Sequence, residues 1–522
     1  MNQEIELKLS FPRAALAQLR DHPVIRATAR CDSIRSLDNI YYDTPSCDLK
    51  THGIALRTRQ QGRLRLQTVK CAAVSTAGLA QRPEWEYPYN GTFNFAPINQ
   101  PEVIRTLTRY HDQLIPILQT RFRRETFRYT PHPGTTILLM IDTGRIRANK
   151  RTAPICELEL ELETGPVTDL LQLAETLAQD LPLQPADQSK AERGYRLFLN
   201  LPPIPVDIVL PDLSPDLTPP EAFRQQALAC LQHWQANTEM LAATKGRYTP
   251  EKHLTIIMQI HHALQRLQAL LQLFSTTLPA VFTDPWLQRL QTLSIPFEQA
   301  ARYTSIHEAL FAPLHSAHIP CQEPARSRLI NTAEKEYRQF YITAARASRS
   351  HEYGLARLSL LSALHCLPSG SNASALPQTH LQTHPLKQFA SERLSHQHKT
   401  LLFNFNAIST SPPANPDALR QSLDLLHHSL FFLSSLLPKK KGKRYRNELD
   451  TMLTRLTRYN TLDQASPLLD EWQEKYPAHR VPIAFLLGWH SARQAIRTPR
   501  LLKHLHHFLQ GTPPWKKDKN RE

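Results

Sequence analysis

The stretch EIELKLSF, residues 4–11, decides the fold of the first part of this chain. Charged and apolar side chains alternate, and a period of two predicts a β-strand with one charged and one apolar face. The stretch ICELELELET, residues 155–164, repeats the pattern with glutamates at two-residue spacing. Like charges at this spacing repel on an exposed sheet, so the pattern favours a closed sheet whose charged faces point inward.

Residues 1–200 contain eight segments with this alternation, separated by turn signals, together with two helical segments. We therefore expect a multidomain α+β protein. Its N-terminal part would be an eight-stranded antiparallel β-barrel that forms a tunnel with flanking helices, and its C-terminal part an all-α helical bundle. The proline-rich residues 201–220 would be a linker, because proline interrupts helices and central strands.

Residues 221–515 have the leucine-, glutamine- and histidine-rich pattern of amphipathic or buried helices. A loop near residues 368–380 would divide this part into two four-helix bundles. Residues 516–522 would form a basic tail. Three histidine pairs could add positive charge at acid pH: His261/His262, His427/His428 and His506/His507.

The formal net charge of +16 indicates an anionic partner, such as a phosphate compound, a nucleic acid or a membrane surface. Seven cysteines without a CxxC pair favour the reducing cytoplasm. The N-terminus has no apolar leader, and the apolar stretches are shorter than the roughly 18 residues of a membrane span. We therefore expect a cytoplasmic protein without a membrane partner.

Acidic and basic strands inside one tunnel would suit phosphate chemistry. Carboxylates hold hard cations such as Mg²⁺, and arginine forks bind phosphate oxygens. Together they provide what metal-assisted hydrolysis of a phosphoanhydride needs. No Walker A, GxGxxG or Ser-His-Asp pattern competes with this interpretation.

Glu4-x-Glu6-x-Lys8 resembles the ExExK signature of the CYTH, or triphosphate tunnel metalloenzyme, superfamily. Further matches follow in order over residues 1–200: YYDTP, GIALRTR, LQTVK, RPEWE, RFRRETF, IDTGRI, ICELELELETG and SKAERGYRL. The resemblance implies a tunnel that binds a triphosphate and hydrolyses it with Mg²⁺ or Mn²⁺.

The resemblance also implies roles for individual residues. The metal ligands would be Glu4, Glu6, Glu157 and Glu159, with Glu161 a further ligand or the base that orients water. The phosphates would be held by Arg57, Arg59, Lys70, Arg82, Arg124 and Lys190. Lys8 would either contact the substrate or position the attacking water. Parity on the strand supports Lys70, whereas Arg63 and Arg65 face the other way.

The helical part resembles a degenerate CHAD domain, a bundle that binds polyphosphate in its family. The family's first basic helix usually reads His-x-x-Arg followed by arginines. Here Met258 takes the histidine place and only Arg266 remains as an expected cation. The candidate polyphosphate-binding residues are a basic run: Lys439, Lys440, Lys441, Lys443, Arg444 and Arg446.

The function expected from these resemblances is an inorganic triphosphatase that cleaves tripolyphosphate to pyrophosphate and phosphate. One alternative within the same fold is a nucleoside or thiamine triphosphatase, or an adenylate cyclase. Another is a non-catalytic protein that binds polyphosphate. We do not expect nucleic acid as a partner.

Overall fold

The computed structural model of the chain shows two compact units. The residues that it describes are 3–27, 31–72, 75–244, 250–306, 310–315, 323–367, 385–410 and 416–516. The first unit consists of residues 1–206, 231–248 and 347–366. The second unit consists of residues 207–230, 249–346 and 367–522. Helices from the later part of the chain therefore belong to the same unit as the N-terminal strands.

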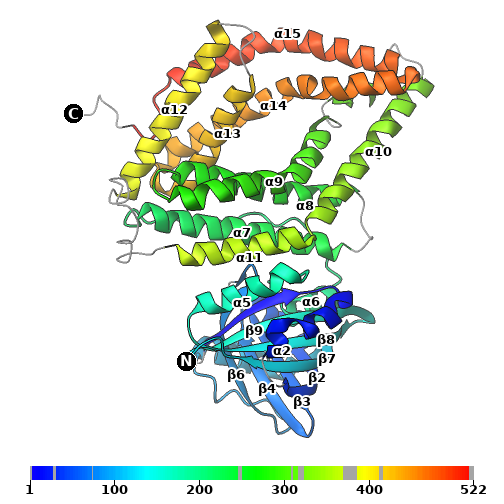
Figure 1. Cartoon of the computed structure of the whole chain (residues 1–522), viewed down its shortest axis with the longest axis vertical. Helices are drawn as coiled ribbons and strands as arrows, with labels where there is room; N and C mark the ends of the chain where they lie inside the picture. The colour runs from blue at the N-terminus through cyan, green and yellow to red at the C-terminus, as the bar shows by residue number, and fades with distance from the viewer. Residues whose placement is uncertain are drawn as a thin grey trace. The chain divides into compact units, whose positions relative to one another are not determined.

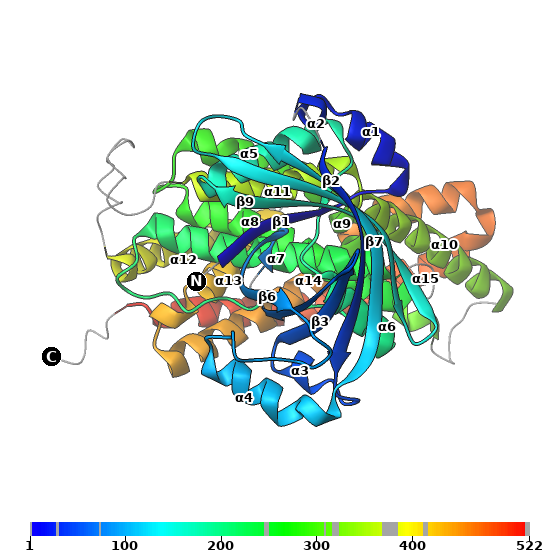
Figure 2. The same ribbon diagram turned by 90° about the horizontal axis from the view of Figure 1, so that it is seen from below.

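A closed antiparallel sheet forms the first unit (Figures 1 and 2). Its eight long strands are β1 (Gln3–Ser10), β2 (Cys31–Asp43), β3 (Ile54–Gln61), β4 (Leu64–Cys71), β6 (Leu79–Pro88), β7 (Ile115–Tyr129), β8 (Thr136–Ala148) and β9 (Arg151–Thr164). They pair in the order β1-β9-β8-β7-β2-β3-β4-β6, and β6 pairs again with β1 to close the ring. Two short strands, β5 (Ser75–Thr76) and β10 (Gln184–Pro185), extend β6 and β1.

Helices cover the apolar outer face of the ring. Leu158 and Leu160 of β9 are fully buried, and helix α5 (Val167–Asp180) packs against this strand. Helices α3 (Asp48–Thr51) and α4 (Pro101–Tyr110) contribute to a second apolar cluster with β3 and β4. Two short helices, α1 (Leu16–Asp21) and α2 (Pro23–Ala27), follow β1. The apolar side of the alternating strands is thus removed from water.

Helix α6 (Lys190–Phe198) packs against the inner face of the sheet. Its Tyr195 shares an apolar cluster with Phe122 of β7 and Ile155 of β9, which point to the same side as the charged residues of these strands. Ser189 forms a capping box with Glu192 and fixes the first turn of the helix. The start of α6 is therefore held firmly beside the enclosed charges.

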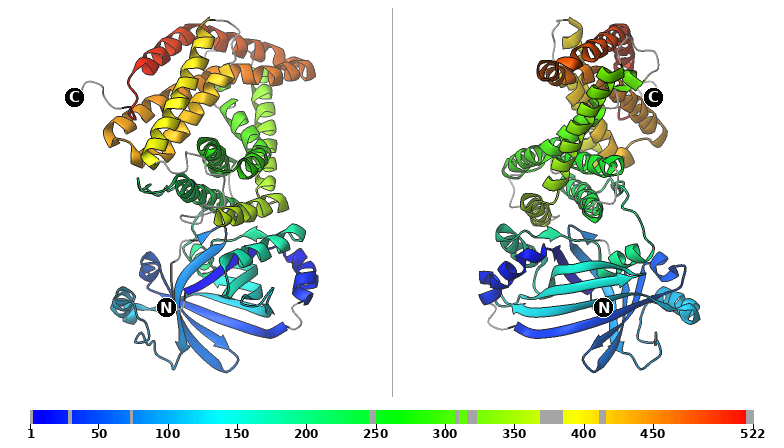
Figure 3. Two further views of the ribbon diagram at one scale, coloured as in Figure 1. Left: turned by 60° about the vertical axis from the view of Figure 1, so that its left-hand side comes forward. Right: turned by 90° about the vertical axis from the view of Figure 1, so that its right-hand side faces the viewer.

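The second unit is built from long helices, as the helical pattern of the sequence predicts. The remaining helices of the chain are α7 (Pro219–Ala243), α8 (Pro250–Phe274), α9 (Ala280–Ser305), α10 (Glu323–Ala347), α11 (His351–Cys366), α12 (Leu386–Thr410), α13 (Pro416–Phe432), α14 (Lys439–Lys475) and α15 (Arg480–Gln510). Helix α13 packs against α8, α12 and α14, and α14 packs against α15 (Figure 3). Of these helices, α11 and the second half of α7 count with the first unit.

The predicted fold class is confirmed: a closed antiparallel sheet comes first and a mostly helical part follows. Residues 201–218 form no regular helix or strand. The loop predicted near 368–380 and all but the first residue of the tail at 516–522 lie outside the described residues. The domain boundaries at 200 and 220 stay predictions. Among the described helices, none has an apolar stretch long enough to cross a membrane.

Candidate active site in the closed sheet

The inner faces of β1 and β9 bring charged side chains together inside the ring. Register pairs Glu6 with Glu161 and Lys8 with Glu159. Glu6, Lys8 and Glu159 each expose less than a tenth of their surface, although they lie on the charged side of their strands. Since the opposite, apolar side is also buried, both faces of these strands are covered. Buried charges are stable only when they are paired.

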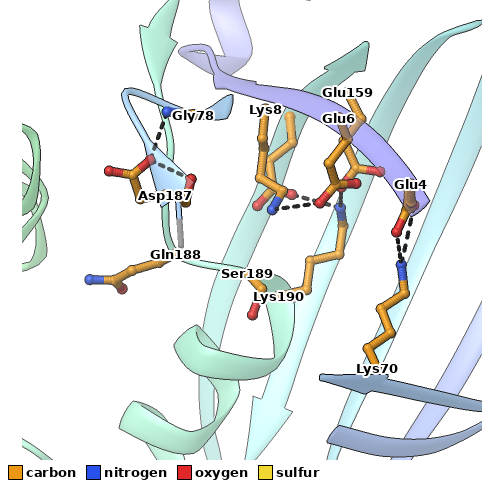
Figure 4. Close-up of polar contacts among 12 residues, drawn as sticks. Glu4, Glu6, Lys8, Lys70, Gly78, Glu159, Asp187, Gln188, Ser189 and Lys190 are labelled. Carbon is orange, nitrogen blue, oxygen red and sulfur yellow. Dashed lines mark hydrogen bonds and ion pairs between the residues drawn. The ribbon is translucent and has the colours of Figure 1, made fainter. Parts of the chain in front are cut away.

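Lys190 lies at the centre of one group of acids (Figure 4). Its Nζ is 2.8 Å from Asp142 Oδ2 and 2.6 Å from both Glu157 Oε2 and Glu159 Oε1. Burial by itself would lower the pKa of Lys190, but the three carboxylates outweigh burial and raise it above its usual value. Lys190 is therefore a permanent cation that holds three acids in one place.

Arg124 joins this group from β7. It donates to Asp142, with Nε–Oδ1 and Nη2–Oδ2 distances of 2.8 and 2.6 Å, and it also contacts Glu159. Burial would raise the pKa of Glu159, but Lys190 and Arg124 outweigh burial and hold that pKa well below its usual range. On the other side, Arg193 of α6 contacts Glu157. At this end of the site each acid therefore has at least one cation beside it.

A second group of acids lies further along β1. Lys70 Nζ is 3.0 Å from Glu4 Oε2 and 2.7 Å from Glu84 Oε2. Glu161 interacts electrostatically with the carboxylates of Glu4, Glu6 and Glu84. Burial first, and then these carboxylates, raise the pKa of Glu161 to about 7, although Lys70 acts in the opposite direction. Negative charge is in excess here.

Three arginines gather on another part of the inner face. Arg59 of β3 donates to Asn39 Oδ1 at 2.9 Å and lies 3.3 Å from Glu86 Oε2. Burial first, and then the neighbouring cations of Arg57 and Arg124, lower the pKa of Arg59 to about 10 against the effect of Glu86. A bound anion would relieve this repulsion, as Arg forks bind phosphate oxygens in two-point contacts.

The structure brings most of the predicted site residues to this inner face. Those with described side chains are Glu4, Glu6, Lys8, Arg57, Arg59, Lys70, Arg124, Glu157, Glu159, Glu161 and Lys190. The backbone of Arg82 pairs with Glu4, but the side chain of Arg82 is outside the described part of the structure. The roles of all these residues stay predictions.

Sequence reasoning omitted three residues that contact the arginines. Glu86 lies 3.3 Å from Arg59 and 3.9 Å from Arg57, and Tyr41 Oη is 3.3 Å from Arg57 Nη1. Asn39 accepts from Arg59. The two-residue spacing was the available signal. It places Glu86 on the same face of β6 as Glu84, and Asn39 on the same face of β2 as Tyr41.

A divalent cation is the group that these acids could hold. Hard cations take carboxylate oxygens, and Glu4, Glu6 and Glu161 offer such oxygens where negative charge is in excess. In the described ranges, no three His, Cys, Asp or Glu side chains already converge on one metal position. The donors therefore fit a metal by their chemistry, and binding one requires a rearrangement of side chains.

The closed sheet thus carries acids and arginines on one inner face. Residues 2–195 match the family model of the CYTH domain, and residues 225–470 match that of the CHAD domain. The chain therefore contains a CYTH domain followed by a CHAD domain, which confirms the resemblance predicted from the motifs.

Known proteins resemble parts of the chain. An inorganic triphosphatase of Haemophilus influenzae is 33% identical over 201 residues, which are 38% of this chain and 55% of that protein. The chain thus spans about half the length of this relative. The solved CHAD domain of the plant Ricinus communis is 21% identical, with a TM-score of 0.47 over 59% of this chain and 98% of that one. A putative adenylyl cyclase from Hippeastrum, described as having a dominant triphosphatase activity, is 19% identical. The match has a TM-score of 0.30 and covers 38% of this chain and 98% of that one.

The substitution Lys190→Met tests the grouping of the acids. It would remove the central cation from three buried carboxylates and leave them with Arg124, Arg193 and Lys8, so we expect the free energy of unfolding of the first unit to fall by about 3–5 kcal/mol. Thermal melting near neutral pH measures this loss.

The pH dependence of the loss has a definite sign. A carboxyl whose pKa is lowered in the folded state stabilises the fold above its unfolded pKa, and the contribution disappears as pH falls through the folded value. The stability gap between wild type and variant should therefore narrow as pH falls below about 4.3, the pKa of an unfolded Glu carboxyl, because wild type then loses the contribution of Glu157 and Glu159. A difference in unfolding free energy that does not change with pH would contradict the pairing of Lys190 with these acids.

Proposed function

We propose that the chain is an inorganic triphosphatase that cleaves tripolyphosphate to pyrophosphate and phosphate inside the closed sheet. One observation carries the proposal: on one inner face of the closed sheet, the carboxylates of Glu4, Glu6 and Glu84 act on Glu161, while Arg57 and Arg124 act on Arg59. A triphosphate with a divalent cation supplies the missing charge of each sign. The identity of 33% with an inorganic triphosphatase supports the same activity.

The arginines and Lys190 would have different roles in the reaction. Arg57, Arg59 and Arg124 bind the phosphate oxygens and neutralise the charge that develops on the transferred phosphoryl group. Because they are largely buried, they act in a region of low dielectric, where electrostatic interactions are stronger than in water. Lys190 keeps Glu157 and Glu159 in place.

The reaction breaks one P–O–P bond and consumes one water. The water oxygen forms a bond to phosphorus, the bridging oxygen leaves with the pyrophosphate, and the water proton passes to a base. Glu161 suits this role because its pKa of about 7 lets it accept a proton near neutral pH. Mg²⁺ or Mn²⁺, held by Glu4 and Glu6 with Glu157, Glu159 or Glu161, would polarise the phosphoryl group when bound. Lys8 would contact the substrate or position the water.

An assay of phosphate release tests the proposal. Purified protein with Mg²⁺ or Mn²⁺ should cleave tripolyphosphate faster than ATP, thiamine triphosphate or long-chain polyphosphate. Arg59→Ala should lower kcat/KM by about 100-fold, since one lost oxyanion contact typically costs this much. The matched control is Arg65→Ala, because Arg65 is an exposed arginine on the adjoining strand.

The outcomes separate the competing functions. Equal rates for wild type and a Glu4→Ala, Glu6→Ala double variant with every triphosphate would rule out the enzyme and leave a binding protein. Faster cleavage of ATP or thiamine triphosphate would favour the organic substrates of the same fold. Formation of cyclic AMP from ATP would indicate a cyclase.

We also propose that the helical part binds polyphosphate, supported by a buried basic cluster between α8 and α13. Arg266 stacks on Phe431 with its Cζ 5.2 Å from the ring, and its Nε and Nη1 have no hydrogen-bond partner within the described residues. His261, His262 and His428 lie close enough to interact electrostatically. Burial first, and then neighbouring histidines or Arg266, lower their pKa values to about 3, 4 and 3.

The predicted basic run lies at the start of α14. Lys439, Lys440, Lys441 and Lys443 are exposed there, at the end of the helix where backbone N–H groups also attract anions. Arg444 forms an ion pair with Glu448 at 3.0 Å, so it is partly neutralised. The lysines are therefore the stronger candidates for contacts with a polyanion.

Retention of long-chain polyphosphate by the full chain tests this second proposal. A Lys439→Glu, Lys440→Glu variant and Arg266→Ala should each weaken retention, and added salt should weaken wild-type retention steeply. The buried histidines, with pKa values of about 3 to 4, take up protons only in acid, so retention should strengthen as pH falls towards about 4. Arg59→Ala serves as the control for binding in the tunnel. Retention that is unchanged in both helical variants would contradict the proposal.

A further inference from the structure

The backbone of Lys8 is clamped between two segments that are far apart in the sequence. Its N–H donates to Gly78 O at 2.9 Å, and its carbonyl accepts from the N–H of Ala186 at 2.9 Å. Gly78 has φ +90, and a Cβ there would lie 2.4 Å from Lys8 O. The position of the Lys8 side chain therefore depends on the β5–β6 turn and on the segment that leads to Lys190.

Asp187 ties these two segments to each other (Figure 4). Its Oδ1 accepts from Ser75 Oγ at 2.6 Å and from the N–H of Gly78 at 2.7 Å. Asp187 lies three residues before Lys190, in the segment that places that lysine among its acids. One carboxylate thus connects the turn against Lys8 with the approach to α6.

Helix α7 holds this segment from the other side. Glu239 accepts from the backbone N–H of Asp187, and its Oε2 lies 3.3 Å from the N–H of Gln188. Gln235, one turn earlier on α7, donates to Pro185 O at 2.6 Å and to Glu239 Oε1 at 3.0 Å. Two side chains of one helix therefore fix the backbone of residues 185–188.

Helix α11 completes the network. The fully buried Arg357 donates to Gln184 Oε1 at 2.5 Å and to Thr238 Oγ1 of α7 at 3.0 Å. Gly354 permits the close approach, because a Cβ there would lie 2.2 Å from Leu183 O. All of these residues belong to the first compact unit.

Two charged groups face Glu239: Asp187, in the segment before α6, and Arg357 of α11. Asp187 in turn interacts electrostatically with Lys8 of β1. Burial first, and then Asp187, raise the pKa of Glu239 to about 8. A raised carboxyl pKa means that the protonated form fits the folded state better. Its contribution to stability is therefore lost as pH rises through about 8.

We propose that Glu239 is a positioning residue for Lys8 and Lys190, so that the chemistry of the tunnel depends on a helix within the CHAD match. Glu239 lies within residues 225–470, whereas both lysines lie within residues 2–195. The inference rests on the proposed triphosphatase activity. Loss of the Glu239 contacts would free residues 185–188 and, through Asp187 and Gly78, loosen the clamp on Lys8.

The full-length variants Glu239→Ala and Glu239→Gln test this role. With tripolyphosphate and Mg²⁺, Glu239→Ala should lower kcat by about tenfold with a smaller change in KM, because small displacements of reacting groups cost rate more than binding. Glu239→Gln keeps an oxygen that can accept from the Asp187 N–H, so it should retain most of the activity at neutral pH. Because Glu239 ionises beside Asp187, the kcat of wild type should decline above about pH 8, and Glu239→Gln should lack this decline.

The matched control is His351→Ala. His351 of α11 contacts Ala178 O of α5, so the variant removes another contact of a helix in the first unit without touching the network around Asp187. A kcat for Glu239→Ala equal to that of His351→Ala, or a pH profile for Glu239→Gln equal to that of wild type, would overturn the inference.

Amide hydrogen exchange separates this inference from the proposed function. If wild type cleaves no triphosphate, the triphosphatase proposal fails, and exchange still tests the clamp. Glu239→Ala should speed exchange in residues 75–80 and 183–190 and leave the strands β3 and β4 unchanged. Unchanged exchange in both segments would overturn the inference whatever the activity.

Discussion

The burial of charge inside a closed sheet is the constraint on which the first compact unit depends. Glu6, Lys8 and Glu159 are almost completely buried, so each needs a partner of opposite charge in a fixed place. Neighbouring strands supply some of these partners, but Lys190 comes from a helix inserted against the inner face. The apolar face of the same strands needs α5 for its cover. The stability of the ring and the arrangement of the site therefore depend on the same contacts.

Charge is not distributed evenly within this ring. Around Lys190 the acids and bases are paired with one another, whereas carboxylates gather around Glu161 and the arginines Arg57 and Arg124 act on Arg59. Complete neutrality would give a more stable unit with less affinity for ions. The imbalance is the feature that we interpret as binding capacity for a metal and a polyanion. Stability and function would be located in different parts of one tunnel.

Alternation along the strands predicted the inner face but not its internal arrangement. Lys70 lies inside with Glu4 and Glu84, while Arg65 of the same strand is exposed, as parity requires. The grouping of the acids depends on the register, which places Glu161 opposite Glu6. Register is set by long-range pairing and turns, so a single sequence does not reveal it.

The contribution of α7 was beyond sequence reasoning for a different reason. Glu239 belongs to a helical pattern that gives no sign of contact with the backbone of Asp187, 52 residues earlier in the chain. Residues 231–248 read as part of the helical region, yet they pack in the first compact unit. Helical periodicity indicates that a face is buried and does not say against what it is buried.

The measurement that tests the central claim most directly is the location of a metal and a triphosphate in a crystal. Crystals grown with Mn²⁺ and a non-hydrolysable triphosphate would reveal the metal by its anomalous scattering. We expect the metal beside Glu4, Glu6 and Glu161, and the phosphates against Arg57, Arg59 and Arg124. A metal and triphosphate bound outside the closed sheet, with the charges inside it still paired to one another, would contradict the account.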